Sequence, residues 1–486
     1  MSQRKVYIET YGCQMNVADT EVVLSVLNQA GYTPTAELDE ADLALMNTCA
    51  IRENAEDKVW NRLTHWRSLK KRKPEMVMGV LGCMAEHLRK DLLKSDKNII
   101  DLVVGPDEYR KLPQLVESTR ADGEAGIAIK LSRTETYDDI LPFRAEGISA
   151  FISVMRGCDK FCTFCVVPFT RGRERSRSIA SIADECKQLE GQGFREITLL
   201  GQNVNSFEDE GKDFSDLLAA CAKAVPSVRI RYTTSHPQDF DQKLVDTMAS
   251  YDNICKYIHL PLQSGSDRIL KLMNRTYTRA HYMSIIEMIK KAMPQAALST
   301  DIIVGFCTET LEDHLETMAV MREVEYEGAY MFNYSPRQNT KAYDTLEDDV
   351  PLEEKTRRLN QIITLQNEIS TRKNLAEIGA EHTILVEGRS KKNESEWKGR
   401  TDTNKMVVFP RIDAEVGEHR RVRILRSNSA TLFGELIDVK VSAHVAERGH
   451  DRGEVVYDLT PLLISTVEPN EQTGLEQPGT ILPIVQ

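Results

Sequence analysis

The alternation of short apolar runs with amphipathic stretches constrains the fold of this chain more than any other feature. Near the N-terminus, strand-like runs occupy residues 5–10, 42–46, 76–81 and 101–105, and helix-like stretches occupy residues 19–30, 54–71 and 84–93. Strands that alternate with helices form a parallel sheet with helices on both faces. We therefore predict an N-terminal parallel α/β sheet domain.

A second alternating run follows a weaker region at residues 106–146, in which we place a linker around residues 130–147. Its strand-like runs occupy residues 150–155, 196–200, 228–233, 257–260, 298–304 and 329–333, and its helix-like stretches occupy residues 178–192, 214–225, 242–250, 279–292 and 311–324. Six β/α units fall short of the eight that close a full barrel. We predict a central open (β/α)6-type barrel, with a long amphipathic helix at residues 352–378 packed on its outside.

The C-terminal part changes to short strand-like runs separated by polar turns. These runs occupy residues 383–387, 406–409, 418–424 and 432–441. Their number and length predict a small β-barrel of OB-like size. The chain is thus of the α/β class, and its predicted domains are residues 3–121, 144–376 and 377–442, followed by a tail, 443–486, of unassigned role.

Composition narrows the classes of protein that fit. No window holds the roughly twenty apolar residues that a membrane helix needs, and the N-terminus lacks the apolar core of a signal peptide. We therefore expect a cytoplasmic protein. Ten cysteines in such a chain favour metal ligation or buried thiols over disulfides. The net charge of −12 argues against a general nucleic-acid coat protein, but it leaves room for a local basic face.

Three cysteines lie close together after the first strand of the predicted central barrel. Cys158, Cys162 and Cys165 have C-x3-C-x2-C spacing, and no fourth cysteine lies nearby in the sequence. Iron–sulfur clusters usually take four thiolates, so three thiolates leave one iron open for another ligand. A zinc site or buried thiols are the alternatives, but zinc usually needs a second pair of Cys or His ligands, and none is evident.

This spacing, at this place in an α/β barrel, resembles the radical-SAM superfamily over residues 147–375. The resemblance implies one [4Fe–4S] cluster whose open iron binds S-adenosyl-L-methionine and cleaves it to a 5′-deoxyadenosyl radical. It also implies that the aromatic residue before the last cysteine, here Phe164, lies near the adenine of that cofactor.

Three further cysteines each follow a predicted strand of the N-terminal domain. Cys13, Cys49 and Cys83 are far apart in sequence, yet the carboxyl ends of parallel strands share one edge of the sheet, where ligand sites form. Gly12 and Gly82 would allow close backbone approach. Three unrelated buried cysteines are the alternative. A second open [4Fe–4S] cluster here would suggest sulfur insertion, because it could present a sulfur species.

The motifs around these cysteines resemble the methylthiotransferase family over about residues 4–442. They are Tyr-Gly-Cys-Gln-Met-Asn at 11–16, Asn-Thr-Cys-Ala-Ile-Arg-Glu-Asn-Ala-Glu at 47–56 and Gly-Cys-Met-Ala at 82–85. The tRNA-modifying branch carries the first of these, whereas the branch that modifies a ribosomal protein typically has Leu-Gly-Cys-x-Lys-Asn.

Several polar residues follow strands of the central barrel, where active sites of β/α barrels lie. The resemblance implies cofactor contacts for Gln202, Asn203, Ser235, Gln263 and Ser264. Ordinary polar loops are the alternative, and His236 and His259 fit a structural role equally well, so we assign no acid–base residue. Cys307 stands where the family commonly has proline; we interpret it as a local substitution rather than a fourth cluster ligand. Cys186, Cys221 and Cys255 are predicted core residues.

Two basic segments are candidates for binding RNA. Arg171, Arg173, Arg175 and Arg177 alternate after the cluster loop and could hold phosphates, or form a solvated face. Residues 389–426 hold eleven Lys or Arg and six Asp or Glu, including Arg389, Lys391, Lys392 and Arg400. A basic barrel on an acidic protein is typical of nucleic-acid binding, and this one resembles the TRAM domain. A protein-binding barrel is the alternative.

The family resemblance implies a specific reaction. One S-adenosylmethionine would methylate a sulfur at the Cys13/Cys49/Cys83 cluster, and a second would supply the radical that activates C2 of N6-isopentenyladenosine at position 37, in the anticodon loop of tRNA. RNA recognition favours such unstacked bases. An electron donor such as flavodoxin or ferredoxin and a sulfur donor are implied as partners. The alternatives are modification of a ribosomal-protein aspartate or of threonylcarbamoyl-adenosine tRNA, and a non-catalytic iron–sulfur RNA-binding protein.

Overall fold

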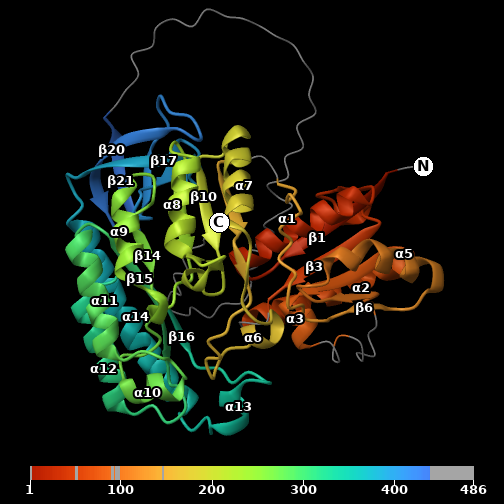
Figure 1. Cartoon of the computed structure of the whole chain (residues 1–486), viewed down its shortest axis with the longest axis horizontal. Coiled ribbons are helices and arrows are strands. Elements are labelled where there is room, and N and C mark those ends of the chain that lie inside the picture. The colour runs from red at the N-terminus through yellow and green to blue at the C-terminus, as the bar shows by residue number, and fades with distance from the viewer. Residues whose placement is uncertain (1–2, 50–52, 89–91, 93–98, 145–146, 438–486) are drawn as a thin grey trace, which may run out of the picture. The chain divides into compact units, whose positions relative to one another are not determined.

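The computed structural model describes residues 3–49, 53–88, 92, 99–144 and 147–437. These residues form two compact units (Figure 1): residues 3–131 with 139–144, and residues 132–138 with 147–437. The predicted tail at 443–486 and parts of the predicted elements 84–93 and 432–441 lie outside the described residues. No helix in the described part of the chain is long and apolar enough to cross a membrane.

The first unit is built on a parallel sheet of six strands in the order β2-β1-β3-β4-β5-β6. The strands are β1 Arg4–Thr10, β2 Tyr32–Pro34, β3 Leu43–Thr48, β4 Val77–Gly82, β5 Leu102–Val104 and β6 Gly126–Ala128. The helices are α1 Gln14–Gln29, α2 Glu53–Arg72, α3 Cys83–His87 and α5 Leu112–Asp122. The central strands β3 and β4 are buried along their whole length, as a sheet covered on both faces requires. The predicted parallel α/β domain is confirmed.

The structure corrects the prediction for this unit in three places. Residues 106–146 are not merely a weak linker region, because helix α5 and strand β6 lie there and complete the sheet. Helix α1 begins at Gln14, five residues before the predicted start at residue 19, so it starts directly after Cys13. Strand β2 was also missed; it is three residues long and ends in proline.

The second unit contains six parallel strands in two adjoining sheets, ordered β13-β10-β7 and β14-β15-β16. Their bounds are β7 Ser149–Ser153, β10 Glu196–Leu200, β13 Arg229–Thr233, β14 Tyr257–His259, β15 Ala297–Val304 and β16 Gly328–Asn333. A parallel bridge between Ile230 and Ile254 joins the two sheets. All six predicted strands of the central domain are therefore present.

Helices cover the outside of these strands in the order in which the chain makes them (Figure 1). They are α7 Ile179–Gly191, α8 Phe214–Ala224, α9 Gln242–Ser250, α11 Arg279–Ala292, α12 Leu311–Val324 and the long α14 Leu352–Leu375. Asp241, Thr278 and Thr310 cap the starts of α9, α11 and α12 by accepting a hydrogen bond from a backbone amide of the first turn. These caps explain why the predicted bounds of those three helices match the structure.

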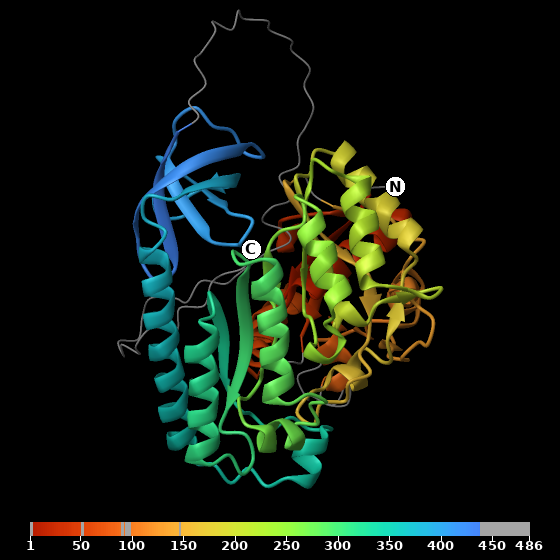
Figure 2. The same cartoon turned by 60° about the vertical axis from the view of Figure 1, so that its left-hand side comes forward.

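Five strands after helix α14 form a closed barrel in the order β17-β18-β19-β21-β20. They are β17 Glu381–Arg389, β18 Glu396–Arg400, β19 Met406–Pro410, β20 His419–Ser427 and β21 Thr431–Leu436. Figure 2 shows this barrel in blue at the end of the long teal helix. Its core contains Ile384, Val407, Phe409 and Leu432. The small barrel is confirmed, although strand β18, which is rich in charged residues, was not predicted.

Candidate functional site

The first cysteine triplet lies on a tight loop between strand β8, Met155–Arg156, and helix α6, Val167–Thr170. Cys158, Cys162 and Cys165 are all partly exposed. The turn into the loop requires glycine, because Gly157 has a φ of +81° and a Cβ there would overlap the backbone oxygen of Arg173. The structure therefore presents all three thiols on one short loop, as predicted.

The electrostatics of this loop fit a metal cluster. Burial, and then the neighbouring charges of Glu174 and Cys162, raise the pKa of Cys158 to about 12. Burial and the other two thiols of the loop likewise raise the pKa of Cys165 to about 12. Three thiolates would thus repel one another in this place unless a cation compensated them, and a bound metal does so and deprotonates the thiols.

The described residues offer no set of three His, Cys, Asp or Glu side chains arranged around a single metal ion. A single zinc ion needs every ligand within about 2.0–2.3 Å of one point. In a cubane cluster each thiolate binds a different iron, so the sulfurs lie further apart. The cluster remains the prediction for this loop because of its C-x3-C-x2-C spacing.

Some of the buried polar atoms that lack a hydrogen-bond partner in the described part of the chain lie at the carboxyl ends of three neighbouring strands. They belong to four of the residues predicted to contact the cofactor: Gln202 Nε2, Asn203 Oδ1, Ser235 Oγ and Gln263 Oε1. A buried polar group without a partner costs about 1–3 kcal/mol, so each such group needs an explanation. Unmet donors and acceptors following β10, β13 and β14 match a ligand with amino, carboxylate and ribose groups, as S-adenosylmethionine has.

Other contacts hold these side chains in place. The backbone amide of Gly157 donates to Gln202 Oε1 at 2.5 Å, which ties this glutamine to the cysteine loop. Asn203 donates to Asp239 at 2.8 Å. Gln263 has a φ of +68°, and its backbone bridges to Ile302 of β15. Each of these three residues therefore has one anchored end and one unmet polar atom.

Two of the predicted cofactor residues differ from this pattern. Ser264 is fully buried, accepts a hydrogen bond from the amide of Ser266 at 3.2 Å and contacts Thr317 at 3.4 Å, so its hydroxyl is already engaged. Phe164 packs edge-on against Phe306 at 6.5 Å and is half-buried, which leaves part of its ring accessible beside the cysteine loop.

His236 is a candidate whose role the sequence leaves open. It is 5% exposed, its Nδ1 accepts from the amide of Gln238 at 3.2 Å, and its Nε2 has no partner among the described residues. Burial, and then the charges of Arg275 and Lys160, lower its pKa to about 2, so the ring is neutral and Nε2 carries the proton. The motif Thr-Ser-His-Pro after a strand was the only signal in the sequence. His259, in contrast, hydrogen-bonds Ser299 at 2.9 Å.

The second cysteine triplet lies at the carboxyl edge of the sheet in the first unit. Cys49 and Cys83 directly follow β3 and β4, and Cys13 lies three residues after the end of β1. These strands are adjacent in the sheet, with Thr10 paired to Asn47 and Thr48 to Gly82. The strand order reverses direction between β1 and β3. Such a reversal opens a crevice for ligands outside the carboxyl ends, and Cys13 and Cys49 flank it.

Glycines allow the loops at this edge to converge. Gly12 has a φ of +114°, and a Cβ there would overlap that of Cys49. Gly82 has a φ of +88°, and a Cβ there would overlap Asn47 and Thr48. The three thiols are thus brought to one edge as predicted, although nothing in the sequence indicated that Cys49 and Cys83 are buried while Cys13 is exposed.

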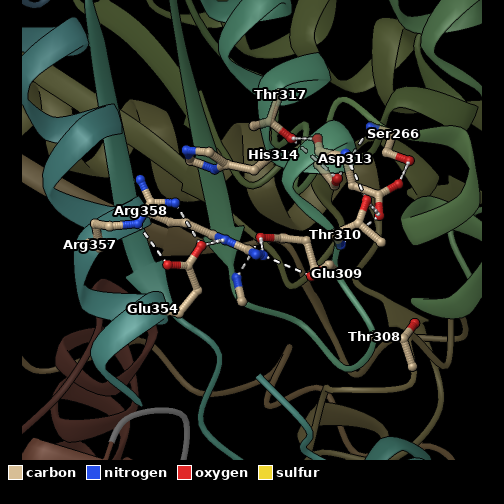
Figure 3. A network of polar contacts seen from close by, with 12 residues as sticks. Ser266, Thr308, Glu309, Thr310, Asp313, His314, Thr317, Glu354, Arg357 and Arg358 are labelled. Atoms are coloured by element: carbon tan, nitrogen blue, oxygen red, sulfur yellow. Dashed lines mark hydrogen bonds and ion pairs between the residues drawn. The ribbon is translucent and has the colours of Figure 1, made fainter. Parts of the chain in front are cut away.

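A polar network fixes the loop that follows β15 (Figure 3). Glu309 accepts from the amide of Gly305 at 2.9 Å and forms a 2.8 Å ion pair with Arg358 of α14. Asp313 accepts from Thr310 and from Ser266 at 2.6 Å. Cys307 lies inside this loop, fully buried in an apolar cluster with Phe306 and Tyr334. That packing agrees with a local substitution. Cys186, Cys221 and Cys255 are likewise buried, as predicted.

Three of the four alternating arginines are buried, so they do not form the exposed phosphate-binding row considered for them. Arg171 is 3% exposed. Arg175 donates to backbone oxygens, including that of Ser132 at 2.8 Å, and Arg177 pairs with Asp138 and Glu185, both at 2.7 Å. Of the four, Arg173 alone is exposed, where it pairs with Asp159 at 2.9 Å. Burial removes Arg171 from the predicted RNA contacts.

The basic side chains of the small barrel also divide into two groups. Arg400 pairs with Glu387 at 3.1 Å, and Arg421 and Arg423 pair with Glu381. The remaining predicted contacts, Arg389, Lys391 and Lys392, are exposed at the hairpin between β17 and β18. Among the described residues, none of these three forms an ion pair, so their charge is available to a ligand.

Family models match the three parts of the chain. Residues 5–105 match "Uncharacterized protein family UPF0004", residues 152–321 match the Radical SAM superfamily and residues 375–437 match the TRAM domain. The fold resembles that of the radical S-adenosylmethionine methyltransferase TsrM from Kitasatospora setae in the structure with cobalamin and a [4Fe-4S] cluster bound. The TM-score is 0.55 at 14% identity, covering 71% of this chain and 77% of that one.

Curated relatives are much more similar in sequence. The tRNA-2-methylthio-N(6)-dimethylallyladenosine synthase of Parabacteroides distasonis is 51% identical over 442 residues, which cover 90% of this chain and 96% of that protein. The protein of the same name from Chloroherpeton thalassium is 50% identical over 435 residues, covering 89% and 96%.

The parallel six-stranded domain, its cysteine loop and the TRAM barrel define a radical S-adenosylmethionine protein with a TRAM domain. That superfamily implies a [4Fe–4S] cluster and S-adenosylmethionine as cofactors. At the level of sequence, the chain belongs to the tRNA-2-methylthio-N(6)-dimethylallyladenosine synthase family.

Proposed function

We propose that this chain is a radical tRNA methylthiotransferase. It adds a methylthio group to C2 of N6-isopentenyladenosine at position 37 of tRNA, with S-adenosylmethionine as both radical source and methyl donor. The observation that carries the proposal is the presence of two cysteine triplets, each at the carboxyl edge of parallel strands in its own compact unit. One triplet serves carbon activation and the other serves sulfur delivery.

Cys158, Cys162 and Cys165 would hold the [4Fe–4S] cluster, which would supply the one-electron chemistry that makes a radical from S-adenosylmethionine for activation of C2. Gln202, Asn203, Ser235 and Gln263 supply the polar atoms that orient the cofactor, and Phe164 borders its adenine. The neutral Nε2–H of His236 is a further donor in this region. No acid–base pair is needed, because hydrogen leaves carbon as an atom and not as a proton.

Cys13, Cys49 and Cys83 would hold a second [4Fe–4S] cluster, which would supply a site for the sulfur. Cys49 and Cys83 are buried and so shielded from solvent, whereas Cys13 is exposed. The neighbouring Tyr11 hydroxyl donates to Glu9 at 2.6 Å, and Glu9 pairs with Arg62 at 2.5 Å, so the loop before Cys13 is firmly held.

The TRAM barrel binds the tRNA through the exposed cations of its β17–β18 hairpin. A sulfur donor replaces the sulfur consumed in each turnover, and a reduced flavodoxin or ferredoxin supplies electrons. The protein acts in the cytoplasm, where tRNA is modified.

Nucleoside analysis tests the substrate. Deleting the gene is expected to remove 2-methylthio nucleosides from tRNA while N6-isopentenyladenosine accumulates, and the intact gene is expected to restore them. If tRNA were unchanged and a ribosomal protein lost the mass of a methylthio group instead, the proposed substrate would be wrong. Anaerobic formation of 5′-deoxyadenosine by the reduced protein tests the enzyme class, because a non-catalytic RNA-binding protein forms none.

Iron analysis tests the two-cluster assignment. We expect Cys13→Ala and Cys158→Ala proteins each to lose about half of the iron and sulfide, since each substitution removes a ligand of one of two clusters. Cys186→Ala is the matched control, because Cys186 is buried between helices and should leave the iron content unchanged. Full iron content in either ligand variant would contradict the assignment.

A further inference from the structure

Helix α10 spans Asp267–Leu272. Its last residue and the two residues after it form hydrogen bonds with the cysteine loop. The carbonyls of Leu272 and Met273 accept from the hydroxyl of Thr163 at 2.9 Å and from its amide at 3.0 Å. Asn274, with a φ of +56°, donates to the carbonyl of Phe161 at 2.9 Å. This segment therefore fixes where the next side chain, Arg275, meets the loop.

Arg275 donates from Nη1 to the sulfur of Cys162 at 3.2 Å. Its Nε donates to the hydroxyl of Tyr277 at 3.0 Å, and its Nη2 donates to the carbonyl of Pro261 at 3.3 Å. Tyr277 in turn donates to the carbonyl of Leu262 at 2.8 Å. The planar guanidinium thus has all three of its nitrogens anchored, with one aimed at a cluster ligand.

The positive charge of Arg275 is not neutralised by an ion pair with any carboxylate among the described residues. Its three hydrogen-bonded neighbours are a thiol, a phenol and a carbonyl. A guanidinium is not deprotonated in proteins, so the side chain is cationic. A buried cation without a carboxylate partner is costly. Its hydrogen bond to the sulfur of Cys162 is the contact through which this charge affects a cluster ligand.

Hydrogen bonds to cluster sulfurs and nearby positive charge are among the factors that set the reduction potential of an iron–sulfur cluster. Reduction by one electron adds negative charge to the cluster, and a fixed cation beside one thiolate stabilises that state more than the oxidised one. The electron comes from an external one-electron reductant, such as a reduced flavin or iron–sulfur protein.

We infer that Arg275 is a positioning residue that raises the reduction potential of the cluster held by Cys158, Cys162 and Cys165, through its charge and its hydrogen bond to Cys162. The inference rests on the proposed function, which assigns the radical cluster to these three cysteines. Its consequence is that Arg275 decides which electron donors can reduce the cluster.

An anaerobic redox titration of the full-length protein, followed by electron paramagnetic resonance, tests this inference. The signal of the radical cluster is the one that is absent in Cys158→Ala protein and present in Cys13→Ala protein. In Arg275→Gln protein we expect the equilibrium constant for its reduction to fall about tenfold, which for one electron is a shift of about 59 mV to more negative potential. Arg275→Lys keeps the charge without the fork of donors, so a smaller shift in the same direction is expected.

Arg279→Gln is the matched control. Arg279 begins helix α11 and pairs with Glu323 at 3.4 Å, away from the cysteine loop, so its loss should leave the potential unchanged. The parent potential in Arg275→Gln protein with full iron content would overturn the inference. Loss of the cluster in both Arg275 variants would also overturn it, because the residue would then be structural. Neither result touches the cluster assignment, which fails only if Cys158→Ala protein keeps all of its iron.

Discussion

Thr308 adopts a backbone conformation that favours glycine. It lies in the loop after β15 with a φ of +63°, where a β-branched residue is strained by roughly 1–2 kcal/mol. Its hydroxyl accepts one exposed hydrogen bond from Arg268 at 3.0 Å. This hydrogen bond offsets only part of the strain energy. We expect Thr308→Gly to raise the free energy of unfolding by about 0.5–1 kcal/mol, measured by urea unfolding followed by circular dichroism.

Thr308→Ala separates the strain from the hydrogen bond. Alanine keeps the cost of the positive φ and removes the hydrogen bond from Arg268, so it should lower the free energy of unfolding slightly or leave it unchanged. Equal stabilisation by glycine and alanine would contradict the explanation through backbone strain.

His236 should make the protein sensitive to mild acid. Its pKa is lowered to about 2 in the folded state, by burial first, whereas an unfolded histidine titrates near 6.5. Below pH 6.5 the unfolded state therefore binds a proton that the folded state does not, and stability falls by up to about 1.4 kcal/mol per pH unit. In His236→Gln protein, the free energy of unfolding should decline less steeply between pH 6.5 and 5, by the contribution of about one proton. Urea unfolding midpoints of proteins with equal iron content measure this difference. Parallel declines would refute the assigned pKa.

The places of individual residues were predicted best where their spacing along the sequence alone indicates the chemistry. The places of the six candidate cluster cysteines could be predicted, because one triplet shares a short loop and the other follows strands that are neighbours in the sheet; their role as ligands stays a prediction. The burial of Arg171 and Arg177 could not be found, because the partners of Arg177, Asp138 and Glu185, lie 39 and 8 residues away and nothing in the charge pattern links them.

At the scale of elements, strong local signals decided what could be predicted. Helices with a capping side chain at the start and a regular apolar face, such as α9 and α11, were predicted to the residue. The elements missed include helix α5, the three-residue strands β2 and β6, and the charged strand β18. These strands are stabilised by pairing with neighbours that are distant in sequence, which overrides their weak local preference.

Arginines of strand β13 join the central parallel strands to the small barrel. Arg231 pairs with Glu196 at 2.8 Å and donates to the carbonyls of Thr401 and Asp402 at 2.7 and 2.8 Å, all in buried or partly buried surroundings. Arg231→Met leaves Glu196 buried without this partner, so we expect the free energy of unfolding to fall by roughly 3 kcal/mol. Hydrogen exchange should show faster opening of the amides of residues 401–405.

The matched control for this interaction removes both charges. Arg231→Met combined with Glu196→Gln leaves no unpaired charge at this pair, so part of the stability should return. Lys243→Gln, at an exposed ion pair with Asp213, should change stability much less than Arg231→Met does. If the double variant were less stable than Arg231→Met alone, the cost would not come from the buried carboxylate.

At the scale of the whole molecule, charge is divided between an acidic chain and one basic module. The chain carries a net charge of −12, whereas residues 389–426 hold eleven basic and six acidic residues. Internal pairing neutralises several of those cations, including Arg400 and Arg420. The exposed hairpin between β17 and β18 can therefore attract a polyanion, even though the acidic remainder of the chain repels it.

This division of charge predicts how tRNA binding depends on salt. Replacing Arg389, Lys391 and Lys392 together by glutamine should weaken tRNA binding. The slope of log affinity against log salt should become shallower by about 0.7–0.9 for each phosphate that the hairpin no longer neutralises, roughly 2–3 in total. Filter binding of tRNA at a series of salt concentrations measures the slope.

Replacing Arg421 and Arg423, which are paired with Glu381, should change the slope much less, because their charge is already compensated. Cluster content and formation of 5′-deoxyadenosine in the absence of tRNA should be unchanged in both variants, since neither touches the cysteine loops. An unchanged slope in the hairpin variant would move the RNA-binding face away from the hairpin, whereas an equal weakening of binding in the two variants would mean that total charge, not its placement, controls binding.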